Sequence, residues 1–487
     1  MAFAEEYTVS QRLILVIIAV FSALTTAGVV FGFQALRPIL IENHVYEHLC
    51  AGDEEKPCNA QILRFNLMFA IASTGTNVFA LPIGHFLDYF GPRLAILVGS
   101  FLFLMGGILF GISGPTFDMY IVGYALLAVG GPFMYISCMH LSQAFPSRAG
   151  LIMAALTGSF DASSLIYLIF NWTYYALGAS VPIQRFFIFY SIVPVALGVT
   201  MNFLMPTTSF TPRPILSITN DEEISRPNTV VDPALDERRP LIDRTEASGK
   251  DTTVALVMKQ LKSVEFIGIA SMTCIYMLKM NFYIGSLGEQ LEDKPGAAEN
   301  PAVVESILTL FNVALPAGGI LAIPFIGFLL DNYMPSTVLL VLSALGLSFG
   351  VLGLIPNLPL QYVTALFFTM LRPLVYTAGN DYCGKTFGFI TFGRVYGTMN
   401  LAAGGFNLVQ YLLSNIAINL MNGQYWGVNL TVTLLQLSMI VFPIYLLYKP
   451  TPPNRWDDAY DSKNREQHRT SVSSNGSANG HAQSGLM

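Results

Sequence analysis

Long apolar runs separated by short polar stretches dominate the chain. A membrane-crossing helix needs about 20 mainly apolar residues, because the hydrocarbon core is about 30 Å thick and a helix rises about 1.5 Å per residue. By this criterion the pattern predicts twelve spans. They are expected near residues 12–35, 63–86, 93–113, 117–141, 148–176, 184–204, 263–285, 304–330, 335–356, 359–380, 394–421 and 426–448. Lipid cannot satisfy exposed backbone groups, so we predict an all-α membrane protein.

Polar segments divide the predicted helices into two sets of six. Residues 205–262 are rich in Pro, Ser, Thr and charge, which is typical of a flexible linker. Residues 450–487 are polar throughout and are expected to form a disordered tail. The predicted domains are therefore a six-helix bundle over 1–204, the linker, a second six-helix bundle over 263–449, and the tail.

The composition agrees with this architecture. Of the 487 residues, 53% are hydrophobic and only 11% are charged, whereas a soluble domain carries about 25% charged residues. The sequence has no basic face with interleaved aromatic residues, so nothing in it indicates nucleic-acid binding. The sequence also lacks metal-ligand spacings, a nucleotide-binding glycine motif and any catalytic constellation. We therefore expect a monomeric protein that is not an enzyme and needs no metal or cofactor.

The distribution of Lys and Arg predicts the orientation. Most of them fall near the termini, in the central segment and in one set of loops. The opposite set of loops holds Arg37, Lys56, Arg64, Arg185 and Lys294. Positively charged loops stay in the cytoplasm, so both termini and residues 205–262 are predicted to be cytoplasmic. Cys50 and Cys58 share a loop on the opposite side, where they could form a disulfide or remain reduced.

A Gly-x-x-x-Asp spacing occurs once in each set of helices. Gly84 and Asp88 end the second predicted span, and Gly327 and Asp331 end the eighth. The two glycines are 243 positions apart, and so are the two aspartates. Matching residues at the same end of corresponding helices favour an internal duplication of six helices.

The segment Gly-His-Phe-Leu-Asp-Tyr-Phe-Gly-Pro-Arg, residues 84–93, resembles the loop signature of the major facilitator superfamily. Gly84 would allow close helix contact, Gly91 would allow a sharp turn before Arg93, and Asp88 would face the positive end of a helix dipole. This resemblance implies two pseudo-symmetric bundles of six helices that rock around a central site.

The same resemblance implies a set of contacts that hold the bundles together on the cytoplasmic side. Arg148 opens the fifth predicted span and Arg394 opens the eleventh, 246 positions later. Pseudo-symmetry then predicts Asp88 near Arg394, and Asp331 near Arg148. The alternative is that these charges only mark the membrane boundary.

A narrower resemblance lies in the fifth span. The segment Gly-Ser-Phe-Asp-Ala-Ser-Ser, residues 158–164, is similar to a stretch of solute carrier family forty-three, and residues 372–376 and 392–397 resemble its fungal relatives. That family includes facilitative transporters of large neutral amino acids and a branch that carries purine nucleobases. The resemblance implies one of these substrate classes.

Polar residues inside the predicted spans are the candidates for substrate binding, because ionisable groups in lipid usually face a cavity or a partner. The candidates are Asp161, Ser163, Ser164, Lys279, Asn281, Tyr283, Arg372, Tyr376 and Asn407. Asp161 could hold a substrate amino group, with Asn407 as its counterpart in the other half. Lys279 or Arg372 could bind a substrate carboxylate or pair with Asp161. Alternatively, each of these groups only joins helices. Spans one, five, seven and ten are expected to hold the substrate.

The central segment contains a candidate sorting signal. Glu237, Leu241 and Ile242 resemble an acidic dileucine motif, which clathrin-adaptor complexes read in extended, disordered peptides. The motif favours a vacuolar or lysosomal membrane, with the plasma membrane as the alternative, although so short a pattern also arises by chance.

These observations predict a transporter of a small polar solute, foremost a neutral amino acid, that works by alternating access. The family resemblance favours facilitated diffusion, and coupling through Asp161 or Asp381 stays open. The alternatives are a purine nucleobase or other small-solute transporter, and a nutrient sensor or scaffold that does not transport.

Overall fold

The computed structural model describes residues 7–50, 57–145, 149–178, 182–207, 255–387 and 391–449. These residues are helical apart from their connections. The first group of helices is Val9–Thr26 (α1), Val29–Gly32 (η2), Phe33–Glu42 (α2), Glu47–Leu49 (η3), Asn59–Val78 (α3), Ala80–Ile112 (α4), Tyr120–Ile136 (α5), Met139–Ala144 (η4), Ala149–Ala162 (α6), Leu165–Ala176 (α7), Ile183–Tyr190 (α8) and Ile192–Leu204 (α9). The second group is Val264–Glu292 (α11), Pro301–Leu321 (α12), Ile323–Asn332 (α13), Pro335–Leu354 (α14), Gln361–Phe387 (α15), Phe392–Phe406 (α16), Val409–Asn415 (α17), Ile416–Leu420 (η6), Trp426–Ser438 (α18) and Val441–Tyr448 (α19).

Ten helical segments among the described residues are long and apolar enough to cross a membrane. The two other predicted spans are also helical, but each fails the criterion of length and apolar character for an identifiable reason. The fifth is divided into α6 and α7, each too short on its own. The tenth is α15, which has 27 residues but carries Arg372, Asp381 and Lys385. The structure is therefore the all-α fold that the apolar pattern predicts.

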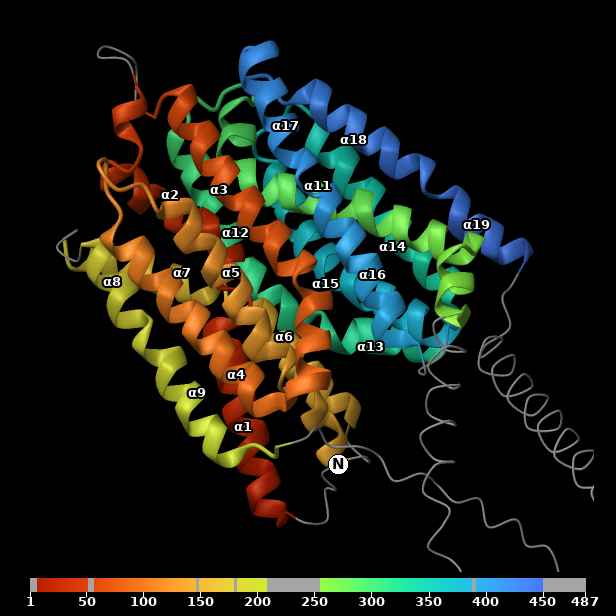
Figure 1. Ribbon diagram of the computed structural model, residues 1–487. Helices are drawn as coiled ribbons and strands as arrows, with labels where there is room; N and C mark the ends of the chain where they lie inside the picture. The colour runs from red at the N-terminus through yellow and green to blue at the C-terminus, as the bar shows by residue number, and fades with distance from the viewer. Residues whose placement is uncertain are drawn as a thin grey trace, which may run out of the picture.

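The helices form two groups according to their place along the chain. In Figure 1, α1 to α9 (red to yellow) lie on one side and α11 to α19 (green to blue) on the other. We call these groups the N half and the C half. They meet where α3 contacts α16 and α17, and where α6 and α7 contact α12. The second span of each half therefore packs against the fifth span of the other half, as the predicted pseudo-symmetry requires.

Helix interruptions recur at corresponding places in the two halves. The second span breaks at Phe79 between α3 and α4, and the eighth breaks at Ala322 between α12 and α13. These positions have the same 243-residue separation as the Gly-x-x-x-Asp pairs. The fifth span breaks at residues 163–164, and the eleventh at 407–408. The repeat in the sequence thus has a counterpart in the backbone.

Glycine allows the chain to turn or to approach another helix at a few defined positions. Gly91 has a φ of 77°, which favours glycine and confirms the predicted turn. The close contact predicted at Gly84 is wrong for this conformation, because a Cβ atom at Gly84 or Gly327 would meet nothing within 4 Å. Close approach occurs instead at Gly404, where a Cβ atom would lie 2.9 Å from the backbone nitrogen of Val78 in the other half.

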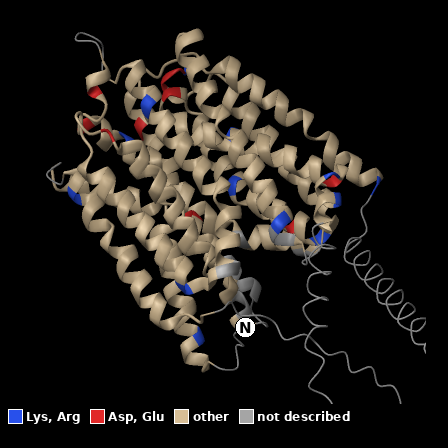
Figure 2. Ribbon diagram, viewed as in Figure 1, with Lys and Arg blue, Asp and Glu red and all other residues tan. Residues whose placement is uncertain are grey.

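Charged residues are sparse in the body of the helices. Figure 2 shows that most Lys, Arg, Asp and Glu lie toward the two ends of the bundle. Large apolar side chains are exposed on the outer helices, including Phe203, Leu321 and Val441, which are 77%, 73% and 66% exposed. An exposed apolar belt of this kind suits contact with lipid.

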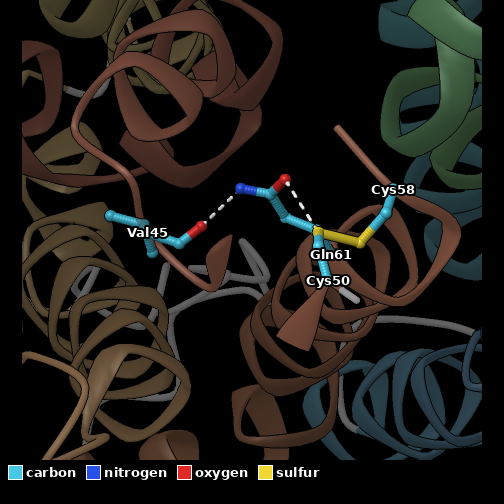
Figure 3. The surroundings of a disulfide bond; sticks show 4 residues. All are labelled: Val45, Cys50, Cys58 and Gln61. Atoms are coloured by element: carbon cyan, nitrogen blue, oxygen red, sulfur yellow. Dashed lines mark hydrogen bonds between the residues drawn. A yellow bond between two sulfur atoms is a disulfide. The ribbon is translucent and has the colours of Figure 1, made fainter. Parts of the chain in front are cut away.

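A disulfide joins Cys50 and Cys58 at one end of the bundle, with a Cα–Cα distance of 5.7 Å. We call this end the disulfide side, and the end that carries the start of α1 and the ends of α9 and α19 the terminal side. Next to the disulfide, the side-chain amide of Gln61 donates a hydrogen bond of 2.7 Å to the carbonyl of Val45 (Figure 3). The disulfide therefore holds Cys50 against Cys58 at the start of α3.

Tyr46, in the same loop, donates a hydrogen bond of 3.0 Å to Asp118 at the start of the fourth span. Burial and the nearby Asp118 carboxylate raise the pKa of Tyr46, so the phenol stays protonated and keeps donating. This contact lies entirely within the N half.

Several predicted features lie outside the described residues. These are the side chains of Asp88 and Asp331, the residue Arg148, the motif of Glu237, Leu241 and Ile242, and the tail 450–487. One boundary is corrected: residues 255–261, predicted as the end of the flexible linker, form a helical turn. It packs because Val257 and Gln260 are buried, and the Gln260 amide donates a hydrogen bond to the carbonyl of Phe387.

We expect Cys58→Ser to lower the thermal stability of the detergent-purified protein. In the chain-entropy account, a bridge that closes so short a loop contributes about 2–3 kcal/mol. The measurement is the unfolding temperature with and without reductant. Reductant should lower the value for the parent protein and leave Cys58→Ser unchanged. Equal sensitivity of the two proteins would contradict the bond.

Candidate functional site

A cavity of about 130 Å³ lies between the two halves. Residues of α3, α4, α5 and α6 line it from the N half, and residues of α15 and α16 line it from the C half. The lining residues are Thr76, Asn77, Ala80, Pro132, Tyr135, Ile136, Met139, Thr157, Phe160, Asp161, Pro373, Tyr376, Asn380, Tyr396 and Asn400. The cavity is large enough for several water molecules. It extends from Asp161 toward the terminal side, because α15 and α16 present Asn380 and Tyr396 nearer to that end.

Asp161 and Arg372 form an ion pair at the inner end of this cavity. Arg372 Nη1 lies 2.5 Å from Asp161 Oδ1, and the two side chains are 2% and 6% exposed. Asp161 belongs to α6 and Arg372 to α15, so the pair joins the two halves. In a low-dielectric interior each charge would be costly without the other. The pair therefore favours the conformation in which the halves meet at this point.

The Arg372 guanidinium is enclosed by aromatic rings. Its central carbon lies 4.6 Å from the ring centre of Phe31 and 5.7 Å from that of Tyr376. Such stacking stabilises a cation where water is excluded. Arg372 Nη2 is buried and has no hydrogen-bond partner. The guanidinium thus keeps one unused donor next to a cavity.

The break between α6 and α7 fixes the position of Asp161. Ser163 donates to the carbonyl of Phe160 and accepts a hydrogen bond of 2.8 Å from the backbone N–H of Gly28, whereas Ser164 donates to the carbonyl of Asp161. These serines were predicted as substrate ligands, but they occupy their hydroxyl groups in backbone contacts. They position the aspartate and do not line the cavity.

Gly319 of α12 allows the C half to approach Asp161. A Cβ atom at Gly319 would collide with the Asp161 side chain. The glycine therefore lets α12 pack directly against the Asp161 side chain.

Lys279 lies in the interior of the C half and does not line the cavity. Its ammonium group donates to Asn429 Oδ1 at 3.0 Å and to Thr433 Oγ1 at 3.4 Å. Tyr283 packs against Phe311, Phe349 and Phe368, also within the C half. Of the two cations considered for a substrate carboxylate, only Arg372 is brought to Asp161, because α11 turns Lys279 toward α18.

Asn407 makes a polar contact between the halves, on the disulfide side of the ion pair, and Asn281 of the same half supports it. Asn281 donates to Asn407, and Asn407 donates a hydrogen bond of 3.0 Å to Ser73 in the N half. Gln410 donates to the same hydroxyl at 2.9 Å. Asn407 is therefore an interface residue and not a cavity counterpart of Asp161.

The residues predicted to hold the halves together on the terminal side are only partly described. Arg93 donates a hydrogen bond of 2.6 Å to the carbonyl of Met205, which ties α4 to the end of α9 within the N half. Arg394 is exposed at the start of α16. The helices do meet as expected, since α4 contacts α16 and a Cβ atom at Gly397 would lie 2.7 Å from Leu81.

The structure brings together Asp161, Arg372 and Tyr376 among the predicted ligands. The second, fourth and eleventh spans line the cavity, although they were not expected to do so. The first and seventh spans were expected to line it, but none of their residues does. The sequence analysis missed Tyr135, Asn380, Tyr396 and Asn400. Asn380 and Asn400 are carboxamides within apolar spans, and that signal could have identified them. Among the described residues no three His, Cys, Asp or Glu side chains cluster as metal ligands.

We expect Asp161→Ala and Arg372→Ala each to destabilise the protein by about 3–5 kcal/mol, because each leaves one buried charge without its partner. The double variant Asp161→Asn with Arg372→Met should recover most of that loss. The measurement is the unfolding temperature in detergent. A double variant no more stable than the single ones would show that the pair does not act as a unit.

Comparison with known proteins agrees with this architecture. The chain matches the family model described as Major Facilitator Superfamily over residues 17–409. It is 34% identical to Protein FMP42 of Saccharomyces cerevisiae, over 87% of this chain and 92% of that protein. It is 24% identical to Equilibrative nucleobase transporter 1 of Bos taurus, over 86% and 92% of the two chains.

A human relative is more distant. The chain is 22% identical to Large neutral amino acids transporter small subunit 3 of Homo sapiens, over 88% of this chain and 92% of that protein. The fold, the contact pattern of the two halves and the extent of the family match lead to one conclusion: the chain is a multi-pass membrane protein that belongs to the major facilitator superfamily of transporters.

Proposed function

We propose that this protein transports a small zwitterionic solute, foremost a neutral amino acid, by alternating access. The Asp161–Arg372 pair at the inner end of the cavity carries the proposal. It offers one negative and one positive group side by side, next to a cavity that extends toward the terminal side.

The pair matches the backbone of an amino acid. The α-ammonium group would bind the Asp161 carboxylate, and the α-carboxylate would bind Arg372, whose Nη2 has no partner. A guanidinium presents its donors as a planar fork that suits a carboxylate. A bound zwitterion would replace the contact between the two side chains by a contact with each of them, so the charges would stay compensated.

The rest of the cavity supports a neutral side chain. Tyr135, Ile136, Met139 and Phe160 give it an apolar and aromatic wall. Asp161 is the single acidic residue among the lining residues, and Arg372 already neutralises it. A cationic side chain would have no further carboxylate to compensate it. The name of the human relative, a large neutral amino acid transporter, favours the same class.

A purine nucleobase is the second candidate. Three carboxamides, Asn77, Asn380 and Asn400, line the cavity together with the ring of Tyr396. Asn presents adjacent donor and acceptor atoms that pair with the edge of a base, and an aromatic ring can stack on its face. The name of the bovine relative also points to nucleobases.

Transport requires that the site face each side in turn. In the described conformation the cavity lies toward the terminal side, and polar contacts between the halves lie at its inner end and beyond it. We propose that the two six-helix halves, 1–204 and 263–449, rock about this site. On the terminal side, Gly84, Asp88, Gly91 and Arg93 with Arg394, and Gly327 and Asp331 with Arg148, would close the entrance.

We further propose that both termini are cytoplasmic. The distribution of Lys and Arg supports this orientation. The Cys50–Cys58 disulfide on the opposite side also supports it, because disulfides persist in oxidising compartments. The candidate sorting motif favours a vacuolar or lysosomal membrane over the plasma membrane.

The central test is uptake into proteoliposomes with a panel of labelled neutral amino acids, cationic amino acids and purine nucleobases. We expect uptake of large neutral amino acids and a loss of at least about 30-fold in uptake efficiency for Asp161→Asn, which corresponds to about 2 kcal/mol for a buried charge left without its partner. Lys279→Met is the matched control, because Lys279 also is a buried charge but lies outside the cavity. It should change uptake by less than about threefold, although it leaves the Asn429 carbonyl unsatisfied.

The outcomes separate the alternatives. Uptake of nucleobases alone would favour the second candidate. Substrate binding without flux would identify a sensor or scaffold. Unchanged kinetics for Asp161→Asn, in protein that is folded in the membrane, would remove the aspartate from the mechanism.

A separate prediction concerns location. Replacement of Leu241 and Ile242 by alanine should move a fluorescently tagged protein from the vacuolar or lysosomal membrane to the plasma membrane, because the adaptor would lose its apolar contacts. The matched control is alanine at Pro240, a variable position inside the motif. An unchanged distribution would exclude the motif as the address.

A further inference from the structure

Arg37 and Glu289 form a second ion pair between the halves, close to the disulfide side. Arg37 Nη1 lies 2.5 Å from Glu289 Oε2, and the side chains are 8% and 7% exposed. Arg37 belongs to α2 and Glu289 to the end of α11, so the first span of one half contacts the seventh span, its counterpart in the other half. Of these two residues, the sequence analysis considered only Arg37.

The surroundings are built to hold this pair. Asn66 of α3 approaches the second carboxylate oxygen, with its Nδ2 3.5 Å from Glu289 Oε1. One turn before Arg37, the amide of Gln34 donates to the carbonyl of Ile284 in the C half. A Cβ atom at Gly288 would lie 3.4 Å from Arg37 Nη1, so the glycine leaves room for the guanidinium. The first and seventh spans are therefore joined at two successive levels.

Each partner lies beyond a break in its own helix. The stretch Val29–Gly32 (η2) separates α2 from α1, so Arg37 is carried by a helix of only ten residues. In α11, Ser286 has φ −125° and ψ 22°, outside the helical region, three residues before Glu289. Short end segments that follow such breaks can tilt while the rest of the span stays packed, since hinges use a few element-terminal residues. The same arrangement occurs in both pseudo-symmetric spans.

We propose that the Arg37–Glu289 pair is the lock of the disulfide-side entrance, carried on two hinged end segments, α2 and the part of α11 after Ser286. This inference rests on the proposed alternating access. While the cavity faces the terminal side, the pair holds the opposite entrance closed. When the end segments part, water reaches both charges and compensates the lost contact. The pair therefore favours the closed entrance without making the open one inaccessible.

The test measures access directly and needs no substrate. Ser73 is buried at the contact between the halves, next to Asn407, and serves as the reporter position. Ser73→Cys is introduced into the full chain with the three free cysteines replaced by alanine. A membrane-impermeant maleimide is then applied from the disulfide side of proteoliposomes. The labelling rate reports how often that entrance is open.

We expect Glu289→Gln and Arg37→Gln each to raise the labelling rate by about tenfold or more, because each removes the preference for the closed state. The charge swap Arg37→Glu with Glu289→Arg should return the rate to within about threefold of the parent value. Tyr46→Phe is the matched control, because it removes a buried hydrogen bond on the same side but within one half. Its labelling rate should not change.

An unchanged rate in both single variants, or a swap that labels as fast as they do, would overturn the lock. If one single variant fails to reach the membrane, the other single variant and the swap decide, because a pair needed only for folding would leave the labelling rate of the other variant unchanged. If the proposed substrate class is wrong and the lock is right, the result differs. Labelling would still respond to the lock while no uptake of amino acids is seen.

Discussion

The buried Asp161–Arg372 pair is the interaction on which the rest of this structure depends. It places two charges at the contact between the halves, where neither lipid nor water compensates them. A carboxylate on α6 can tolerate this position only with a cation from the other half, and the cation only with aromatic rings around it. In this fold α6, α15 and the ring of Phe31 therefore meet at the ion pair, and the cavity begins there.

Backbone details make that meeting point reachable. The fifth span breaks directly after Asp161, and the hydroxyl groups of Ser163 and Ser164 satisfy the backbone there. Gly28 and Gly32 in the first span approach Phe160 and Ser164 so closely that a Cβ atom would collide with them. Small residues and helix breaks are what allow charged side chains to meet across an interface that apolar packing would otherwise hold further apart.

Among the described residues, the polar contacts between the halves lie at the inner end of the cavity and toward the disulfide side. Three contacts lie in order from the cavity toward the disulfide side. The first is the central ion pair, the second is the set of hydrogen bonds from Asn407 and Gln410 to Ser73, and the third is the Arg37–Glu289 pair. On the terminal side, helix packing at Gly397 and Gly404 accompanies a cavity. Within the described part of the chain, the cavity therefore lies on the terminal side of these polar contacts, as one state of the proposed alternating-access cycle requires.

The membrane environment, the helical class, the twofold division and the turn at Gly91 can be predicted from the amino-acid sequence, because they follow from local composition and spacing. Apolar length decides which segments can cross lipid, and a repeated Gly-x-x-x-Asp pattern needs no knowledge of contacts. The sequence also singles out Asp161 and Arg372, since ionisable groups in apolar spans are conspicuous. The sequence leaves open whether Asp161 pairs with Arg372 or with Lys279.

The partner of Asp161 becomes known only from the packed helices, because helix rotation and crossing set which face of a span meets which neighbour. The rotation of α11 directs Lys279 to Asn429 and Thr433, and it directs Glu289, nearly three turns later, to Arg37. Tyr135, Asn380 and Asn400 became cavity residues for the same reason. The two carboxamides are visible in the sequence, but the sequence does not show which face of the helix each one occupies. The cavity unites residues that lie more than two hundred positions apart.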